Sequence, residues 1–272
     1  MIETTLCVTS YNRPNKLKEV LRSFFMTTTY DLSKLELIIV DNGSTDRSVT
    51  DFIKDYSPDC SYSFILNEKN DYPSCLRYSK IQARAIAKGD FYIDCPDDHI
   101  FIARTSWIEN CISRIKSDDT VGCINYYAYP MYRFSKPKNK MTIDSKATEF
   151  SVSSYKGYAD FHIMSKKAYN KIGEYKYKLG RKAESEYMDR SLNEGYFRNL
   201  MVNPVAICMD DGSFGEGSCG FELIRPIPSD EYNSKLIGFM RKCHPDRVSL
   251  PIHNEALIKF CLQEGYIRIK DE

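Results

Sequence analysis

The first hundred residues alternate between short apolar runs and amphipathic helical patterns, and this alternation restricts the fold more than any other feature. Apolar runs at 5–10, 35–40, 63–66 and 91–93 have the length of buried strands. Between them, apolar side chains recur at helical spacing within residues 17–25, 49–56 and 76–87. Three strand–helix units followed by a fourth strand predict parallel pairing through right-handed crossovers, and therefore an α/β fold.

Residues that favour helix ends lie where these helices should begin and end. Ser44 or Thr45 is predicted to cap the second helix, and Pro73 suits the first turn of the third. Gly89 is predicted to end the third helix in the left-handed conformation. Near the chain end, residues 252–261 predict a further helix and residues 266–270 alternate like a strand.

Composition restricts the class of partner and the location. The 272 residues suit one extended domain or a domain with a small appendage. Lysine and arginine number 38 against 37 acidic residues, so the overall charge excess typical of nucleic-acid-binding proteins is absent. No signal-peptide pattern or long apolar span occurs. We expect a cytoplasmic protein without a transmembrane segment, with peripheral contact to a membrane left open.

The ten cysteines include no CxxC pair, which excludes a zinc ribbon. Cys7, Cys111 and Cys261 lie within apolar periodic stretches, where a free thiol acts as a small buried apolar group. This pattern predicts reduced cysteines rather than a disulfide framework.

Polar residues follow the first, second and fourth predicted strands. In parallel sheets ligands bind beyond the carboxyl ends of the strands, so acidic, amide and aromatic groups should meet at one rim. Neither GxGxxG after the first strand nor GxxxxGK[ST] is present, which disfavours a dinucleotide dehydrogenase and a P-loop NTPase. The segments that follow these strands are residues 9–13, 41–43 and 97–99.

Four segments in order resemble the GT-A fold inverting glycosyltransferases of family 2, which use nucleotide-diphosphate sugars. They are VTSYNRP at 8–14, IIVDNGSTD at 38–46, GDFYI at 89–93 leading to Asp97 and Asp98, and AESEYMDR at 183–190 followed by Gly195 and Tyr196. The resemblance covers about residues 4–215. It implies a GT-A (Rossmann-like) mixed, mainly parallel sheet flanked by helices.

The resemblance implies a nucleotide-sugar site. The aspartate after the second strand binds the nucleobase in such enzymes, and this position is Asp41; the alternative is an aspartate that only closes a turn. Tyr11 could stack on the base and Arg13 could reach phosphate, or both could be ordinary surface residues. Thr9 and Arg77 are further candidates for nucleotide-sugar binding.

The same resemblance implies a divalent cation, Mn²⁺ or Mg²⁺, held by an Asp-x-Asp element after the fourth strand. Pro96 stands where relatives often have the first aspartate, so Asp98 is the expected ligand and Asp97 should lie nearer the ribose or sugar. Oxygen donors suit both ions. His99 could favour Mn²⁺, although a histidine facing solvent is the commoner arrangement.

The catalytic base of the family is usually an aspartate six residues before an arginine. Counting back from Arg190 places Glu184 at that position, and Ala183 where relatives have a glutamate. Glutamate carries the same carboxylate on a longer side chain, and Glu186 is a competing candidate. The alternative is that these residues are solvated acids on a helix face.

Together these features predict a metal-dependent inverting glycosyltransferase that uses a UDP-sugar. A non-catalytic nucleotide-sugar-binding relative and a nucleotidyltransferase are the alternatives, although the latter normally has a basic, glycine-rich loop after its first strand. The acceptor stays open between a glycan, a lipid-linked glycan, a protein and a modified nucleic acid, as does the oligomeric state. We predict a domain at 1–228, with a nucleotide-sugar half at about 1–100 and an acceptor half at about 101–228, followed by a small appendage at 229–272.

Overall fold

The fold is known from a computed structural model of the 272-residue chain. It describes residues 1–70, 75–127, 141–143, 149–152, 162–174, 186–187, 190–191, 198–209, 220–232, 234–235 and 254–270. The helices of these ranges are α1 (Pro14–Thr27), the 3₁₀ turn η1 (Leu32–Lys34), α2 (Arg47–Asp55), α3 (Cys75–Ile86), α4 (Trp107–Ser117), α5 (Lys166–Ile172) and α8 (Asn254–Gln263). The strands are β1 (Thr4–Ser10), β2 (Leu35–Asp41), β3 (Ser61–Leu66), β4 (Phe91–Pro96), β5 (His99–Phe101), β6 (Ala103–Arg104), β7 (Val121–Tyr127), β8 (Met141–Ile143), β9 (Glu149–Val152), β10 (His162–Ser165), β11 (Arg198–Cys208), β12 (Gly220–Leu223), β13 (Ile227–Pro228) and β14 (Ile267–Lys270).

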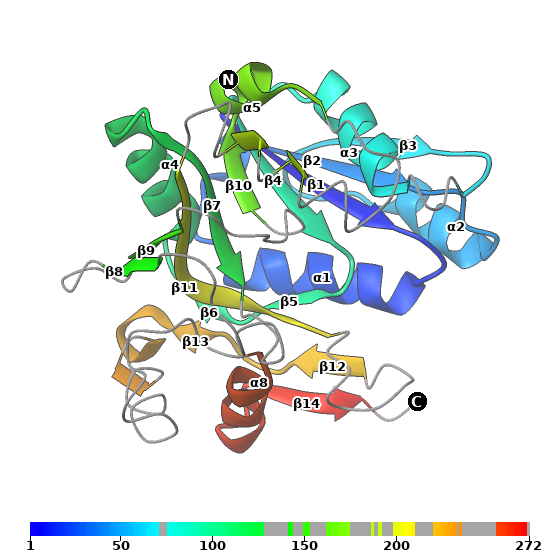
Figure 1. The fold of residues 1–272 in the computed structure, drawn as a ribbon. Coiled ribbons are helices and arrows are strands. Elements are labelled where there is room, and N and C mark those ends of the chain that lie inside the picture. Colours follow the sequence, from blue (N-terminus) through cyan, green and yellow to red (C-terminus); the bar gives the residue numbers. More distant parts are fainter. Residues whose placement is uncertain are drawn as a thin grey trace.

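Within the described ranges, one mixed sheet runs in the order β3-β2-β1-β4-β10-β7-β11-β9-β8, and β5 pairs with β11 (Figure 1). The pairs β3–β2, β2–β1 and β1–β4 are parallel. Strand β10 is antiparallel to both β4 and β7, and β11 is parallel to β7. The predicted α/β fold with a mainly parallel sheet is confirmed in its first four strands.

Alternation along the strands explains how both faces of the sheet are covered. Leu6 and Val8 of β1 belong to the large apolar cluster that includes side chains of α1, α2 and α4. Cys7, between them, packs with Ala83 of α3 on the opposite face. Strand β2 is buried on both faces, so its sequence, LELIIVD, is a nearly continuous apolar run rather than an alternating one. Figure 1 shows α1 on one side of the sheet and α3 on the other.

The second helix is capped by a different residue from those predicted. Asp46 accepts a hydrogen bond from the Ser48 backbone N–H at 2.9 Å and is the N-cap of α2. Ser44 and Thr45, the predicted caps, instead contact Asp41 and Asn12 respectively. Pro73 lies outside the described residues.

Gly89 follows α3, but it does not adopt the predicted left-handed conformation. Its position is explained by close approach to β1: a Cβ on Gly89 would lie 2.7 Å from the backbone nitrogen of Thr5. The Gly89 N–H also donates to Thr5 Oγ1 at 3.0 Å. Glycine is therefore needed here for space rather than for a positive φ.

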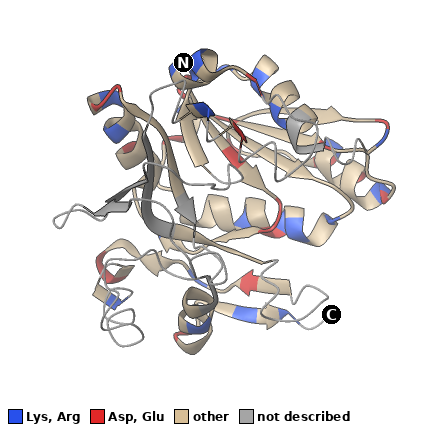
Figure 2. Ribbon diagram, in the orientation of Figure 1, with Lys and Arg blue, Asp and Glu red and all other residues tan. Residues whose placement is uncertain are grey.

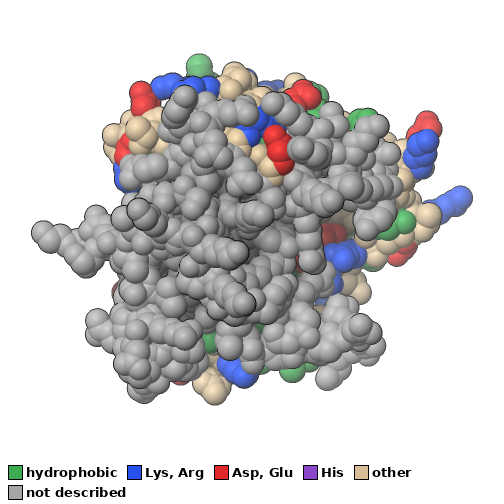
Figure 3. Space-filling view, in the orientation of Figure 1, with side chains coloured by type: hydrophobic (Ala, Val, Ile, Leu, Met, Phe, Trp, Pro, Cys, Tyr) green, Lys and Arg blue, Asp and Glu red, His purple; other side chains and the backbone are tan. Residues whose placement is uncertain are grey.

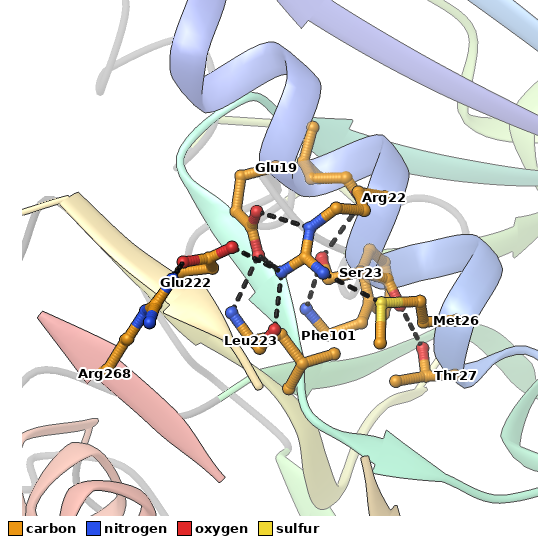
Figure 4. Close-up of polar contacts among 10 residues, drawn as sticks. Glu19, Arg22, Ser23, Met26, Thr27, Phe101, Glu222, Leu223 and Arg268 are labelled. Atoms are coloured by element: carbon orange, nitrogen blue, oxygen red, sulfur yellow. Dashed lines mark hydrogen bonds and ion pairs between the residues drawn. The ribbon is translucent and has the colours of Figure 1, made fainter. Parts of the chain in front are cut away.

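The chain end packs against the main sheet's helix α1. Strand β12 pairs with β14 in antiparallel register, and Leu257 and Ile258 of α8 belong to the same apolar cluster as α1. Figure 4 shows the polar side of this contact. Arg22 of α1 binds Glu19 at 2.8 Å and donates to the Leu223 carbonyl of β12 at 2.6 Å. The predicted helix and strand near the chain end are confirmed, and the domain boundary after residue 228 stays a prediction.

Charges of both signs are interspersed over the described surface. In Figure 2, helices α1, α2 and α4 carry both basic and acidic residues, and the described rim of the face in Figure 3 shows both signs side by side. Among the described residues, no helix has the length and apolar character needed to cross a bilayer. Cys7, Cys111 and Cys261 are buried, as predicted, and form no disulfide within the described ranges.

Candidate functional site

The carboxyl ends of β1, β2 and β4 form one edge of the sheet. Ser10, the last residue of β1, is in register with Asp41 of β2, while Thr9 is in register with Pro96 of β4. The Asn42 N–H donates to the Ser10 carbonyl at 2.9 Å and continues this pairing past the strand ends. The polar residues expected at one rim therefore do lie together, on either side of β1.

Asp97 is held by two residues of the first strand and loop. Ser10 Oγ donates to Asp97 Oδ2 at 2.7 Å, and Arg13 Nη1 lies 3.4 Å from Asp97 Oδ1. Burial, followed by the charge of Asp98, raises the pKa of Asp97 to about 6, while Arg13 and Ser10 limit that rise. Asp97 is thus a buried carboxyl oriented by β1, and the Arg13 side chain remains 45% exposed at the rim.

Asp98 contacts a buried histidine. Its Oδ1 is 2.7 Å from His99 Nδ1. Burial alone would raise the pKa of Asp98, but the interactions with His99, followed by the charges of Arg13 and Lys16, together outweigh burial and hold this pKa below its usual value. The expectation that His99 faces solvent was wrong: His99 lies in β5, in the interior of the molecule, and is buried.

Asp98, His99 and Cys208 form a cluster with metal-ligand chemistry. The three ligand atoms all lie within 4.8 Å of one another. This is the one such cluster among the described residues, and three oxygen, nitrogen and sulfur donors at this spacing could hold a divalent cation.

Asp41 anchors the turn that follows β2. Its carboxylate accepts from the Ser44 N–H at 3.0 Å and from Ser44 Oγ. Asn12, at φ 53°, donates its N–H to Ser44 Oγ at 2.8 Å, and its side chain accepts from the Thr45 N–H. The loops after β1 and β2 are therefore bound to each other. Asp41 therefore closes the turn after β2, which was one of its two predicted roles. Its binding of a nucleobase stays a prediction.

Gly43, within this turn, has a φ of 78° and touches the segment after β3. A Cβ at Gly43 would lie 2.1 Å from the carbonyl carbon of Lys69. Asn42 Nδ2 also donates to Asn70 Oδ1 at 3.1 Å. The turn after β2 therefore requires glycine for both conformation and space.

Of the remaining residues predicted to bind the nucleotide sugar, the structure describes the side chains of Tyr11 and Thr9 but not that of Arg77. Tyr11 is 38% exposed at the rim, and Thr9 is half-buried between β2 and β4. Arg77 lies on α3, but its side chain is outside the described residues.

Glu184, the predicted base, also lies outside the described residues. Its competitor Glu186 is described, and it binds Arg190 with Nε to Oε1 at 2.8 Å. Arg190 in turn donates to the carbonyl oxygens of Ile172 and Glu174 at the end of α5. Glu186 thus has a structural contact that orients Arg190, and the choice of base stays a prediction.

Three ionisable residues in the interior, at and beside β4, contact one another in a way that the sequence did not indicate. Asp94 is buried in β4 and forms an ion pair with Arg84 of α3. His162 Nε2 lies 3.4 Å from Asp94 Oδ2. Only the pairing of β4 with both β1 and β10 places Asp94 inside the sheet, and its sequence neighbours do not reveal this.

Comparisons with known proteins agree with this geometry. The family model described as "Glycosyl transferase family 2" matches residues 5–176. No curated protein matches the chain. The fold is similar to that of the mannosyltransferase PcManGT from Pyrobaculum calidifontis, in complex with GDP-Man and Mn²⁺, at 16% identity and a TM-score of 0.58 over 97% of this chain and 69% of that one.

S. aureus TarS 1-349 is also similar, at 13% identity and a TM-score of 0.55 over 74% of this chain and 58% of that one. Its complex with UDP-GlcNAc gives a TM-score of 0.54 at 14% identity, over 74% of this chain and 56% of that one. The present chain thus spans less than two thirds of the length of TarS 1-349. Because the family model covers more than half of the chain and the sheet has the same GT-A arrangement, the chain belongs to glycosyl transferase family 2.

Proposed function

We propose that the protein transfers a sugar from a nucleotide-diphosphate sugar, a UDP-sugar, to an acceptor hydroxyl with inversion at the anomeric carbon. The observation that carries this proposal is the convergence of Asp41, Asp97 and Asp98 on the carboxyl edge of three neighbouring strands. Family membership and the bound GDP-Man and UDP-GlcNAc of the similar structures support a nucleotide-sugar donor.

The donor's nucleotide would lie against the turn after β2. The Asp41 carboxylate is proposed to accept a hydrogen bond from a base N–H, a role that the N3–H of uracil fits. Tyr11 offers an exposed ring for stacking, and Arg13 offers an exposed cation for phosphate. Thr9 and Arg77 are proposed as further donor contacts, and Asp97 is proposed to face the ribose or sugar.

The diphosphate carries negative charge that increases as it departs. Asp98 is the proposed ligand for Mn²⁺ or Mg²⁺, and His99 beside it is a second donor. A bound divalent cation supplies charge stabilisation to the leaving diphosphate. In the similar PcManGT structure the ion is Mn²⁺.

The acceptor must lose a proton as it attacks. The Glu184 carboxylate is proposed to take the proton from the acceptor hydroxyl, whose oxygen forms the new bond to the anomeric carbon. The bond from that carbon to the phosphate oxygen breaks on the opposite face, and its electron pair leaves with the diphosphate. Arg190, bound to Glu186 and to the end of α5, is proposed to hold the segment that carries this base.

The test is release of nucleotide from a panel of UDP- and GDP-sugars, with Mn²⁺ and with a range of acceptors. We expect turnover with a UDP-sugar, abolished by Asp98→Ala and lowered about 10²- to 10⁴-fold by Glu184→Gln, the usual contribution of a general base. Unchanged release rates in both variants would show that the site assignment is wrong. Tight donor binding without turnover would instead identify a non-catalytic relative.

Asp119→Ala is a matched control for loss of a carboxylate. Asp119 precedes β7, which runs parallel to β4 because both are antiparallel to β10. Asp119 therefore lies near the amino edge of the sheet, opposite the site, where it binds only the exposed Lys167 in the contacts described. Its removal should leave turnover unchanged.

A further inference from the structure

Cys208 is held next to His99 by backbone pairing. Strand β11 is antiparallel to β5, with Cys208 opposite His99 and Ile207 opposite Ile100. The Met209 N–H donates to the Asp98 carbonyl at 2.6 Å, so the pairing extends to the acidic residue. The position of the thiol relative to the histidine is therefore fixed by the sheet rather than by a side-chain rotamer alone.

The thiol and the imidazole also project from the same face. Residues directly opposite each other in an antiparallel pair point to the same side of the sheet. Ile207 and Met209, on either side of Cys208, are buried in the large apolar cluster, whereas Cys208 is only half-buried. Alternation along β11 thus directs Cys208 away from that apolar cluster, toward the side of the sheet where His99 and Asp98 have their ligand atoms.

The donor set differs from the one that magnesium prefers. Mg²⁺ takes oxygen ligands, while thiolate sulfur and imidazole nitrogen increase affinity for transition-metal ions in the order Mn²⁺, Co²⁺, Zn²⁺. Asp98, His99 and Cys208 offer one oxygen, one nitrogen and one sulfur within 4.8 Å. Three protein ligands leave further positions for other ligands such as phosphate oxygens.

We propose that Cys208 is a third metal ligand beside Asp98 and His99, and that this thiolate makes the site selective for transition-metal ions over Mg²⁺. This inference rests on the proposed function only for the location of the ion at the donor phosphates. On binding, the ion displaces the proton of the Cys208 thiol, which passes to solvent, and no change of oxidation state is involved.

The experiment is titration of the metal-free protein with Co²⁺, without any nucleotide, followed by absorption spectroscopy. A thiolate bound to Co²⁺ gives a charge-transfer band in the near ultraviolet, separate from the weaker visible bands that report the ion itself. We expect the charge-transfer band to reach its maximum at one Co²⁺ ion per protein molecule. Adding Zn²⁺ should displace the Co²⁺ and abolish the band, whereas a large excess of Mg²⁺ should leave the band in place.

Cys208→Ser removes the sulfur while keeping a side chain of similar size. We expect it to lose the charge-transfer band and to bind Co²⁺ more weakly, by more than the about 10- to 100-fold effect of losing an outer hydrogen-bond partner. Cys60→Ser is the matched control because Cys60 is also half-buried but precedes β3 at the other end of the sheet. His99→Gln should weaken binding and keep the thiolate band at saturating Co²⁺.

A band that persists at full strength in Cys208→Ser, or Co²⁺ that is displaced by Mg²⁺ at equal concentration, overturns the proposal. Urea unfolding of Cys208→Ser shows whether the variant is folded, and Cys208→Ala provides a second variant at the same position. Because no sugar nucleotide is present, this result is independent of the proposed transfer. Metal binding through Cys208 in a protein that binds no nucleotide sugar would uphold this inference while contradicting the proposed function.

Discussion

Arg84 of α3 and Asp94 of β4 form an ion pair in which each side chain is 1% exposed to solvent. The guanidinium also lies over the ring of Tyr169, with its carbon 4.5 Å from the ring centre. Tyr187 Oη is 3.5 Å from Arg84 Nη1. The pair therefore joins the parallel half of the sheet to α5 and to the segment that carries Glu186.

Removing one partner of this pair should be far more harmful than removing both. Arg84→Met leaves the Asp94 carboxylate buried without its cation, and we expect a loss of about 3–5 kcal/mol in the free energy of unfolding. Arg84→Met combined with Asp94→Leu should recover most of that loss. Urea unfolding of the two single variants and the double variant measures the coupling, and purely additive effects would contradict it. Lys167→Met, in the exposed pair with Asp119, should cause no measurable change.

The same pair predicts a dependence of stability on pH. Burial alone would raise the pKa of Asp94, but the Arg84 guanidinium, followed by Lys80 and His162, outweighs burial and holds this pKa below its ordinary value. A carboxyl with a lowered pKa in the folded state adds stability above its ordinary pKa of about 3.9, and that stability is lost as the pH falls toward the lowered value.

Unfolding measured between about pH 3 and 7 should therefore show a smaller acid-induced loss in Asp94→Asn than in the native protein. The variant will be less stable at neutral pH, so the informative quantity is the difference between the two pH profiles. Parallel profiles would mean that Asp94 is not ionised in the folded protein.

Gly43 should be intolerant of any side chain. Gly43→Ala forces a residue with a Cβ to a φ of 78° and places that carbon 2.1 Å from Lys69. We expect a loss of stability above about 1 kcal/mol and weaker UDP binding, because the turn that carries Asp41 must shift. Gly220→Ala is the matched control, since its nearest contact would be an ordinary 3.6 Å from Lys270. Equal stability of both variants would contradict the close packing of this turn.

Asp41→Asn should weaken UDP binding by about 1.5–3 kcal/mol, the range for a hydrogen bond to a charged group. Calorimetric titration of the two proteins with UDP measures this difference. Asp46→Asn provides the control, because an asparagine retains the capping hydrogen bond to Ser48 and Asp46 is outside the proposed contacts. If Asp41→Asn binds UDP like the native protein, the carboxylate serves only the turn with Ser44.

The strands and helices of the first hundred residues were predictable because their signals are local. Buried strands such as Leu35–Asp41 are nearly continuous apolar runs, and helical spacing identifies the side of α1 that faces the sheet. The positions of Asp41, Asp97 and Asp98 at one edge follow from parallel order alone. Helix caps were less predictable, because Ser44 and Thr45 are held by Asp41 and Asn12, the latter from a different loop.

The rest of the site depends on contacts between distant residues. Cys208 lies opposite His99 only because β11 pairs with β5, across more than a hundred residues of sequence. Arg84 and Asp94 are ten residues apart, yet their pairing requires α3 to pack on the face of the sheet to which Asp94 projects. Nothing in the local sequence of either residue indicates such a neighbour.

The antiparallel pairing of β12 with β14 makes the last strand part of the scaffold around α1. Deletion back to residue 253 would leave β12 with an unpaired edge and would uncover the apolar cluster where Leu257, Ile258 and Cys261 are buried. Uncovered strands and apolar patches promote aggregation. A protein limited to residues 5–176, the range that the family model matches, would lack β12, α8 and β14 and should aggregate during purification.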